Sequence, residues 1–412
     1  MFSSLISFCF MLGLGLAIFG DSAKTEIKKT SLELPAAVSE LGFVTVGVVN
    51  SAREIMVASE EPYRVMDAQG RQLFAGNKFA PTKIRPNAAG IQIGPQSFSR
   101  PPLTIESRGG AFKVDGKTYR HAIKIWREEN GTLSVVNIVG IEDYLKGVLP
   151  SEMTATWPLE ALKAQAVASR TYALFKAIEK KQERSVLSRD ILSQVYGGKG
   201  AEHAATNRAV DATAGEILTY RGKIFPAYFH STCGGKTTRA DYQWRVEEHP
   251  VLQGVECSFC RSSKHYRWSS SMKIAEIQRR LRKQGVPVKE IHRIALADLD
   301  ASGRARVVEV EDGKNTFRIN SNDFRLWMDP MHIKSTLINA VDWEGDSVRF
   351  RGKGWGHGVG LCQFGAKGLA DLGYNYRQIL DHYYPDAEIT VLETSTVQSP
   401  VSKAKKLLQE VI

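Results

Sequence analysis

One stretch of the chain, residues 140–176, limits most strongly what the rest can fold into. Trp157 followed by Pro158 marks the start of a helix, because proline's fixed φ suits the first helical position and its missing N–H is no loss there. Helix formers continue to Lys176, with apolar side chains recurring at three- and four-residue spacing. The pattern predicts one long helix with a buried stripe. A polar strip beside the stripe is formed by Gln165, Ser169 and Tyr172.

An acidic residue, Glu152, stands before this helix in the bend expected after Pro150. General-acid catalysis near neutral pH needs a proton donor whose pKa is raised by a partly apolar setting. Leu149, Met153 and Trp157 are close enough in sequence to provide that setting. The alternative is a solvated loop carboxylate, which is the usual position of a glutamate.

Four segments of the chain, in this order and spacing, resemble the SpoIID/LytB family. That family is named after the stage II sporulation protein D of spore formers and an amidase enhancer of cell-wall turnover. A single motif would be only a hypothesis, but four ordered blocks over roughly residues 40–390 make coincidence improbable. The blocks are the stretch 140–176, SQVYGG at 193–198, YFHSTCGGKT at 228–237 and the segment 352–389 that begins GKGWGHGVG.

The resemblance implies a peptidoglycan lytic transglycosylase that cleaves the MurNAc–GlcNAc bond of glycan strands. It also implies that the glutamate of the SEM triplet, here Glu152, is the catalytic acid. In that reaction the sugar's own C6 hydroxyl closes on the anomeric carbon and gives a 1,6-anhydro product. The second carboxylate of ordinary glycosidases is then not required.

The sporulation branch of the family further implies strands depleted of stem peptides and a cell-wall amidase as partner. A second function class stays open. In it, the chain is a non-catalytic glycan-binding module that activates an amidase, and Glu152 is idle.

Further substrate-binding residues are predicted in the glycine-rich segment 352–360, which has glycine at every second position. Such glycines let a strand or loop approach a partner backbone closely. Trp355 offers a flat ring for sugar stacking, while His357 and Gln363 project polar groups. The alternative is a tightly packed hairpin whose histidine is satisfied internally.

The long helix supplies three more substrate-binding candidates. Arg170 is interpreted either as a group that orients Glu152 or binds the sugar, or as a structural ion-pair residue. Gln165 and Tyr172 are candidates of the same kind.

The cysteines allow two interpretations. His230 and Cys233 form an HxxC pair and Cys257 and Cys260 a CxxC pair, which is acceptable spacing for a Cys₃His zinc site. An exported protein lives where disulfides form, so Cys233 can instead bridge to Cys257 or Cys260. The sequence favours a disulfide or structural staple, and Cys362 is interpreted as a packed residue. The expected chemistry requires no cofactor, and structural zinc stays an alternative.

The first 23 residues predict export as a signal peptide. Leu5–Phe19 is almost wholly apolar but too short to span a bilayer comfortably, and small residues at Gly20–Ala23 offer a cleavage site. Because Met1–Phe10 holds no Lys or Arg, an uncleaved N-terminal anchor stays open. The folded part is therefore expected outside the cytoplasmic membrane, periplasmic or on its cell-wall side, and in contact with the membrane only through that segment.

The net charge of +11 is compatible with attraction to an anionic cell wall or membrane surface. It would also suit nucleic acid, but no nucleic-acid motif accompanies it. Nucleic acid is accordingly not expected as a partner.

The whole pattern predicts an α+β fold. Residues 40–120, where short apolar runs alternate with Gly, Pro and Asn, form a small β-rich module. Residues 121–390 form a larger mixed catalytic region with a substrate groove, and residues 391–412 a tail. The helix over 158–176 packs against strands contributed from both sides of it in the sequence. Glu152, His230 and His357, far apart in sequence, are expected to line the groove.

Overall fold

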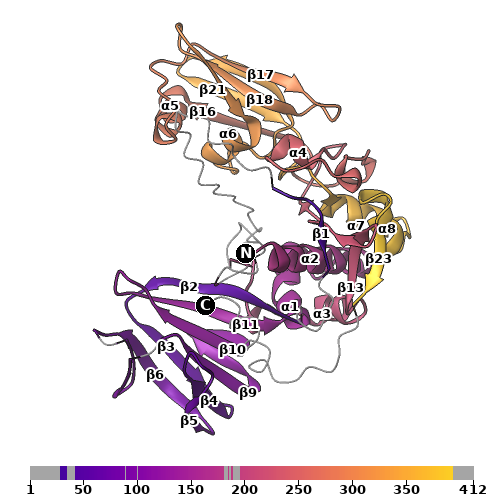
Figure 1. Ribbon diagram of the computed structural model, residues 1–412. Coiled ribbons are helices and arrows are strands. Elements are labelled where there is room, and N and C mark those ends of the chain that lie inside the picture. The colour runs from indigo at the N-terminus through magenta and orange to yellow at the C-terminus, as the bar shows by residue number, and fades with distance from the viewer. Residues whose placement is uncertain are drawn as a thin grey trace.

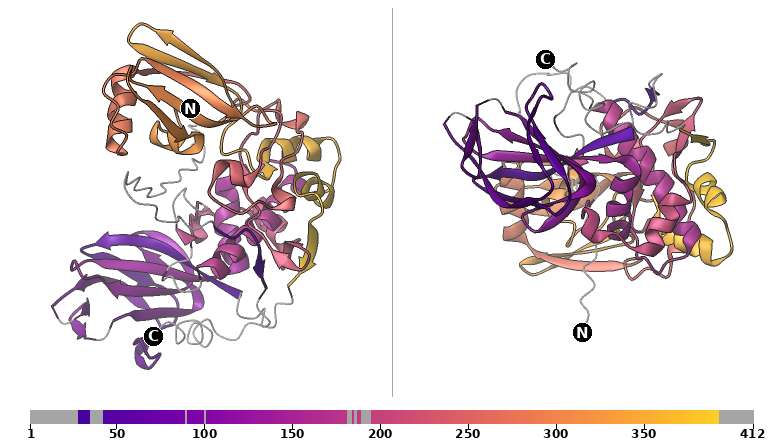
Figure 2. Two further views of the ribbon diagram at one scale, coloured as in Figure 1. Left: turned by 45° about the horizontal axis from the view of Figure 1, so that its top comes forward. Right: turned by 90° about the horizontal axis from the view of Figure 1, so that it is seen from below.

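The structure is a computed structural model that describes residues 28–34, 42–88, 90–99, 101–180, 184, 187–188 and 195–392 of the 412. The predicted export segment and nearly all of the predicted tail lie outside these residues. Strands and helices are mixed, which confirms the α+β class. A helical centre joins a curled N-terminal sheet to a second β-rich lobe (Figures 1 and 2).

The N-terminal sheet curls because its strands are long, twisted and interrupted by bulges. Its order is β12-β2-β11-β10-β9-β3-β6-β7-β8, with β4 joining β9 and β5 joining β4; only β12 pairs in parallel. The sheet continues past the predicted boundary at residue 120, since β10 and β11 are part of it. The strands are β2 (Phe43–Ala52), β3 (Ile55–Ser59), β4 (Tyr63–Met66), β5 (Gln72–Gly76), β6 (Phe79–Pro86), β7 (Ile91–Ile93), β8 (Gln96–Phe98), β9 (Leu103–Val114), β10 (Lys117–Arg127), β11 (Leu133–Gly140) and β12 (Leu187–Ser188).

The helical centre is built around α2 (Leu159–Glu179), which begins directly after Pro158 as the sequence predicts. It packs against strands from both sides of it in the sequence, among them β2 and β13, as expected. Its other neighbours are α1 (Ile141–Glu152), α3 (Ala204–Asp211), α7 (Gln363–Asp371) and α8 (Tyr376–Tyr383). A small sheet in the order β1-β14-β13-β23 lies alongside; it comprises β1 (Leu32–Glu33), β14 (Lys223–Ile224), β13 (Glu216–Tyr220) and β23 (Glu388–Val391).

One local expectation differs from the structure. Pro150 does not start a bend; α1 continues through it, and Glu152 is the last helical residue. Proline's φ is itself helical, and in the last turn of a helix its missing N–H removes only one intrahelical bond. Glu152 therefore projects from a helix end and not from a loop.

The second β-rich lobe has its own apolar core around Ile277, Phe324 and Phe350, which the sequence does not separate from the rest of residues 121–390. Two three-stranded antiparallel sheets, β16-β21-β20 and β17-β18-β19, carry it. The lobe also carries α5, a helix with three basic residues in its last turn. The elements are β16 (Trp268–Lys273), α5 (Ile274–Lys283), β17 (Arg293–Leu299), β18 (Ala305–Glu311), β19 (Thr316–Asn320), α6 (Ser321–Trp327), β20 (Ile338–Glu344) and β21 (Ser347–Gly352).

A short parallel pair, β15 (Phe229–His230) and β22 (Leu361–Cys362), joins the centre to the glycine-rich segment. The close approach that alternating glycines predict is present at Gly360, whose φ is +67° and where a Cβ would lie 2.1 Å from the Tyr228 carbonyl oxygen. The remaining helical turns are α4 (Ala240–Gln243), η2 (Lys199–Ala201), η3 (Pro250–Leu252) and η4 (Ser258–Cys260). Among the described residues, no helix combines the length and apolarity needed to cross a membrane.

Candidate active site

Glu152 is half-buried at the C-terminal end of α1, where its carboxylate accepts two hydrogen bonds. One comes from Gln363 Nε2, at 3.2 Å from Glu152 Oε2, and the other from the backbone N–H of Val195. Burial raises the pKa of Glu152 to about 7, although both hydrogen bonds stabilise the carboxylate and lower that pKa. A carboxyl group in this state is protonated in a large fraction of molecules near neutral pH, as a general acid must be.

The amide of Gln363 is oriented by a second glutamine. Gln165 Nε2 donates to Ser169 Oγ at 2.9 Å, which leaves Gln165 Oε1 facing Gln363 Nε2 at 3.5 Å. The two hydrogens of the Gln363 amide are thus directed at Gln165 and Glu152. Gln165, predicted as a substrate-binding residue, lies fully buried and instead supports the partner of Glu152.

The segment 195–198 is locked onto α1, and this fixes the second donor. The Gly197 N–H donates to the Gly147 carbonyl oxygen at 3.0 Å, and Tyr196 Oη donates to Asn137 Oδ1 at 2.8 Å. A Cβ on Gly147 would lie 2.7 Å from the Tyr196 ring, so α1 needs a glycine there. These contacts hold Val195 next to Glu152.

Two partly exposed aromatic residues, Trp157 and Phe364, are close in sequence to Glu152 and to its donor Gln363. Trp157 and Phe364 meet edge to face with ring centroids 4.9 Å apart. Trp157 follows Glu152 by five residues, and Phe364 directly follows Gln363. The sequence did not single out Phe364, because its position becomes informative only when Gln363 is known to contact Glu152.

The predicted sugar platform at Trp355 is placed differently. The Trp355 side chain is only 5% exposed. The centroid of its ring is 3.9 Å from that of His265 and 5.2 Å from the Lys334 ammonium nitrogen. An indole enclosed in this way offers no open face for stacking. Trp157 and Phe364 are more exposed than Trp355.

His230 and His357 are brought together, with ring centroids 5.4 Å apart. His357 Nε2 donates to the Phe229 carbonyl oxygen at 2.8 Å, and its Nδ1 accepts from the Val359 N–H at 3.1 Å. This is the internally satisfied histidine of the alternative interpretation. Burial lowers the pKa of His230 to about 3 and that of His357 well below its usual value, so both rings are neutral near pH 7.

The connection from these histidines to Glu152 runs through β22. His230 pairs with Cys362, and the next residue, Gln363, contacts Glu152. Nε2 of His230 is buried and has no partner among the described residues. That both histidines line one groove with Glu152 stays a prediction.

Arg170 and Tyr172 lie in packed surroundings. The Arg170 guanidinium is fully buried, forms a bidentate pair with Glu142 at 2.9 and 2.6 Å, and donates to the Glu216 carbonyl oxygen at 2.9 Å. These contacts match the structural ion pair that the sequence left open. Tyr172 is 5% exposed and packs against the ring of Phe229.

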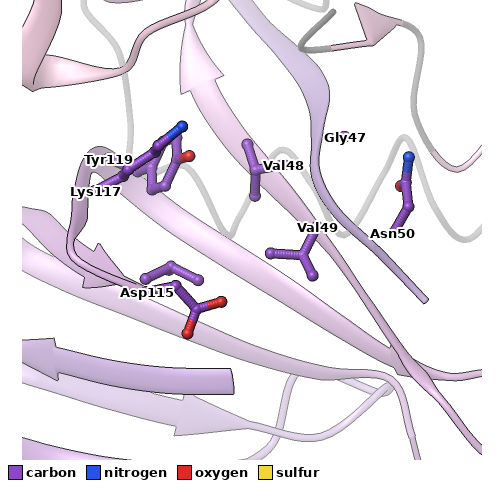
Figure 3. A pocket seen from close by; sticks show the side chains of 8 residues that line it. Gly47, Val48, Val49, Asn50, Asp115, Lys117 and Tyr119 are labelled. Carbon is purple, nitrogen blue, oxygen red and sulfur yellow. The ribbon is translucent and has the colours of Figure 1, made fainter. Parts of the chain in front are cut away.

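A separate pocket of 470 Å³ lies in the N-terminal sheet, at one end of β2 and the turn between β9 and β10 (Figure 3). None of the predicted site residues lines it. Its lining consists of Gly47, Val48, Val49, Asn50, Val114, Asp115, Lys117 and Tyr119.

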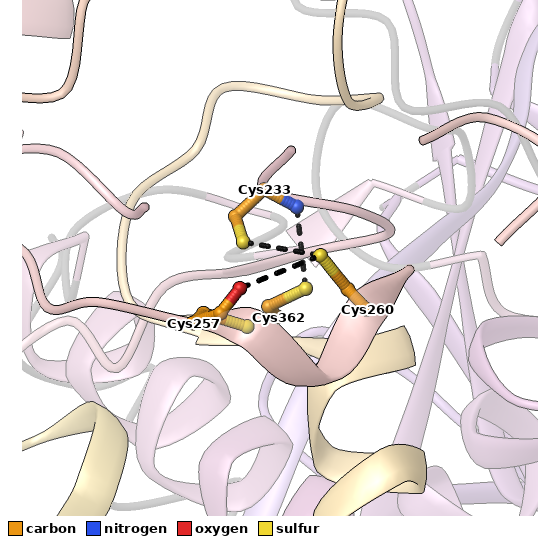
Figure 4. Close-up of side chains that lie close together, drawn as sticks. All are labelled: Cys233, Cys257, Cys260 and Cys362. Atoms are coloured by element: carbon orange, nitrogen blue, oxygen red, sulfur yellow. Dashed lines mark hydrogen bonds between the residues drawn. The ribbon is translucent and has the colours of Figure 1, made fainter. Parts of the chain in front are cut away.

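The cysteines gather in a way that the sequence did not predict. The thiols of Cys233, Cys257, Cys260 and Cys362 are buried and free, and their four sulfur atoms all lie within 4.8 Å of one another (Figure 4). The closely spaced sulfurs of Cys233 and Cys260 are 3.5 Å apart, well beyond the roughly 2.05 Å of a disulfide. Cys362, interpreted as a packed residue, is therefore the fourth member in place of His230.

Comparison with known proteins yields two family models. One, described as stage II sporulation protein (SpoIID), matches residues 129–220, which include Glu152 and its donor Val195. The other is described as a domain of unknown function (DUF8618) and matches residues 240–360, which contain the second β-rich lobe.

Individual relatives span more of the chain. An uncharacterized protein of Brachyspira hyodysenteriae is 34% identical over 74% of this chain and 80% of its own length. Stage II sporulation protein D of Bacillus subtilis is 30% identical over 65% of this chain and 79% of its own length. The amidase enhancer of Bacillus subtilis is 29% identical over 60% of this chain but only 40% of its own length.

Proposed function

The chain belongs to the SpoIID family, and from that premise we propose that it is a lytic transglycosylase of peptidoglycan glycan strands. The observation that carries the proposal is the carboxyl group of Glu152, whose burial raises its pKa to about 7 at the end of a helix. Within the described residues its polar partners are an amide and a backbone N–H, and no carboxylate is among them. One carboxyl group is what a lytic transglycosylase uses.

Glu152 serves twice in the proposed reaction. Protonated Glu152 gives its proton to the oxygen that leaves as the bond from MurNAc C1 to GlcNAc breaks. The C6 hydroxyl oxygen of the same MurNAc then bonds to C1, and its proton passes to the Glu152 carboxylate, which restores the acid. No water is consumed, and the product carries a 1,6-anhydro end. The amide of Gln363 and the N–H of Val195 stabilise the carboxylate between these two transfers.

Trp157 and Phe364 supply the aromatic surface on which a sugar ring next to the scissile bond stacks. Their partial exposure and their positions in the sequence near Glu152 and Gln363 support this role. His230 and His357 are neutral near pH 7, so in this proposal Glu152 alone provides the proton.

The second candidate function is activation of a cell-wall amidase by a chain that binds strands without cleaving them. It is favoured by the likeness to the amidase enhancer of Bacillus subtilis. Either function places the folded chain outside the cytoplasmic membrane, where peptidoglycan lies. Strands from which an amidase has removed stem peptides are the proposed substrate, with that amidase as partner.

Mass spectrometry of purified glycan strands after incubation with the protein tests the proposal. We expect new 1,6-anhydro ends, in higher yield from peptide-free strands than from intact peptidoglycan. New reducing ends would indicate hydrolysis and a different mechanism. Absence of any cleavage, together with faster peptide release when a cell-wall amidase is added, would favour the activating module.

A further inference from the structure

We propose that Cys233, Cys257, Cys260 and Cys362 bind one structural Zn²⁺ ion through four thiolates. Cys233 follows β15, Cys257 and Cys260 flank and end the turn η4, and Cys362 ends β22. The ion would therefore join three segments that are far apart in the sequence. All four cysteines are 0% exposed, as a structural zinc site requires.

The sulfur spacing suits a tetrahedral ion. With zinc–sulfur bonds of about 2.3 Å, the edge of a tetrahedron of thiolates is about 3.8 Å. The sulfurs of Cys233 and Cys260 are 3.5 Å apart, and no two of the four are more than 4.8 Å apart. Small movements of the side chains bring the set to coordination distance, and a buried set of four sulfur ligands selects zinc or iron over harder cations.

Polar groups around the sulfurs are arranged to stabilise negative charge. The Cys233 N–H is 3.2 Å from Cys362 Sγ, and the Gly235 N–H is 3.4 Å from Cys233 Sγ. Tyr383 Oη is 3.1 Å from Cys257 Sγ. Donors of this kind orient and support metal-bound thiolates.

A buried cation beside the cluster adds an independent observation. Arg304, from the turn between β17 and β18, is 0% exposed and donates to the carbonyl oxygens of Cys233 and Lys236, at 2.5 and 2.7 Å. Its Nε is buried and has no partner among the described residues. A fully buried guanidinium requires nearby negative charge. Asp300, which accepts a hydrogen bond from the Arg304 backbone N–H, supplies part of this charge. Zinc with four thiolates would carry a net charge of −2 and add to it.

His230 is not the fourth ligand, although the HxxC spacing suggested it. Its Nδ1 is 3.1 Å from the Val359 carbonyl oxygen, and neither ring nitrogen belongs to the group of atoms that share the site. Parallel pairing of β15 with β22 sets His230 opposite Cys362 in the register, and it is Cys362 that supplies the sulfur.

Metal analysis of the purified full-length chain and two single variants tests the site. We expect about one zinc per chain in the wild type and in His230→Gln, and a loss of at least tenfold in Cys362→Ser. A metal-free wild type with two fewer titratable thiols would overturn the proposal in favour of a disulfide. Retention of zinc by Cys362→Ser together with its loss from His230→Gln would overturn the ligand set, and iron in place of zinc would overturn the metal.

Cobalt substitution keeps the test decisive if Cys362→Ser does not fold. Wild-type protein in which Co²⁺ replaces the native metal should show the intense sulfur-to-cobalt charge-transfer absorption of four thiolates. A spectrum of three sulfurs and one nitrogen would contradict the assignment. Chelation should also lower the melting temperature of the zinc-loaded protein, because metal binding is coupled to folding.

The zinc site also has a consequence for the candidate active site, and this consequence rests on the proposed function. Cys362 is the N-cap of α7, and the next residue is Gln363, the donor to Glu152. Zinc would therefore hold the start of α7 in place. A wild-type protein that binds zinc but does not cleave glycan strands would contradict the proposed transglycosylase activity and not the metal site. The two proposals can therefore fail separately.

Discussion

At the scale of single residues, the central feature is one carboxyl group whose charge is opposed by burial and supported by two donors. Sequence motifs make Glu152 the candidate acid. The motifs do not reveal that Gln363 donates a hydrogen bond to Glu152. The two residues are 211 positions apart, and their contact depends on how α7 packs against the helical centre. Gln165 was predicted to bind substrate, and in the structure it is buried and contacts Ser169 and Gln363. A polar position on a helix does not by itself reveal whether it faces substrate or another side chain.

Replacing Gln363 by leucine should shift the pH profile of cleavage. The Gln363 hydrogen bond lowers the pKa of Glu152, so its removal raises that pKa further above about 7. The fall of kcat/KM on the alkaline side should then move to higher pH. The exposed Gln72 in β5 provides a matched control, Gln72→Leu, whose profile should equal that of the wild type. A Gln363→Leu profile unmoved or shifted to lower pH would contradict this account of the carboxyl environment.

Glu152 should also make stability depend on pH. Its folded-state pKa of about 7 lies above the ordinary 4.5, so between these values the folded state holds a proton that the unfolded state has lost. Stability is therefore lost as the pH rises through this window. The free energy of unfolding of Glu152→Gln, relative to that of the wild type, should therefore rise by about 2 to 3 kcal/mol from pH 4.5 to pH 8. Urea unfolding at several pH values measures this, and a difference that does not change with pH would show that the carboxyl group is not desolvated.

Trp157→Leu should raise KM several-fold and leave kcat nearly unchanged, because stacking of an aromatic ring contributes about 0.5–1.5 kcal/mol beyond its buried area. Trp343, which is 41% exposed in the second β-rich lobe, gives the matched control Trp343→Leu. Melting temperatures of both variants would exclude unfolding as the cause. Equal KM values for the two variants would remove Trp157 from the substrate surface.

At the scale of elements, residues close in sequence predicted where a helix begins, but contacts between distant segments could not be predicted in this way. The start of α2 at Pro158 follows from the residues next to it. The course of α1 through Pro150 did not, since a proline beyond the first turn disfavours a helix and local sequence does not show the packing that keeps α1 helical. The four-cysteine cluster was missed because Cys362 reaches it only through the pairing of β22 with β15.

The close approach at β22 can be tested with a pair of glycines. Gly360 and Gly373 both have positive φ, but a Cβ at Gly360 would lie 2.1 Å from the Tyr228 carbonyl oxygen, while a Cβ at Gly373 has nothing within 4 Å. Each alanine substitution costs about 1 kcal/mol for the backbone conformation. Gly360→Ala should cost at least about 2 kcal/mol more. Equal free energies of unfolding would mean that β15 and β22 do not pack as closely as the structure has them.

At the scale of the whole molecule, composition and motif order predicted an α+β chain but not its subdivision. The boundary expected at residue 120 falls inside β10, and the sheet continues through β11 to Gly140. The second β-rich lobe has a core of its own that no periodicity marked as separate. The lobe nonetheless reaches the helical centre through Arg304, which bonds to the carbonyl oxygen of Cys233.

We propose above all that Glu152, held in this setting by the whole fold, is the acid that cleaves glycan strands. Glu152→Gln is nearly isosteric but has no proton to give to the leaving oxygen. Its rate of 1,6-anhydro end formation, measured by mass spectrometry on purified strands beside the wild type, tests the claim directly. We expect a fall of about 10²- to 10⁴-fold with strand binding retained in co-sedimentation. Turnover equal to that of the wild type would contradict the claim.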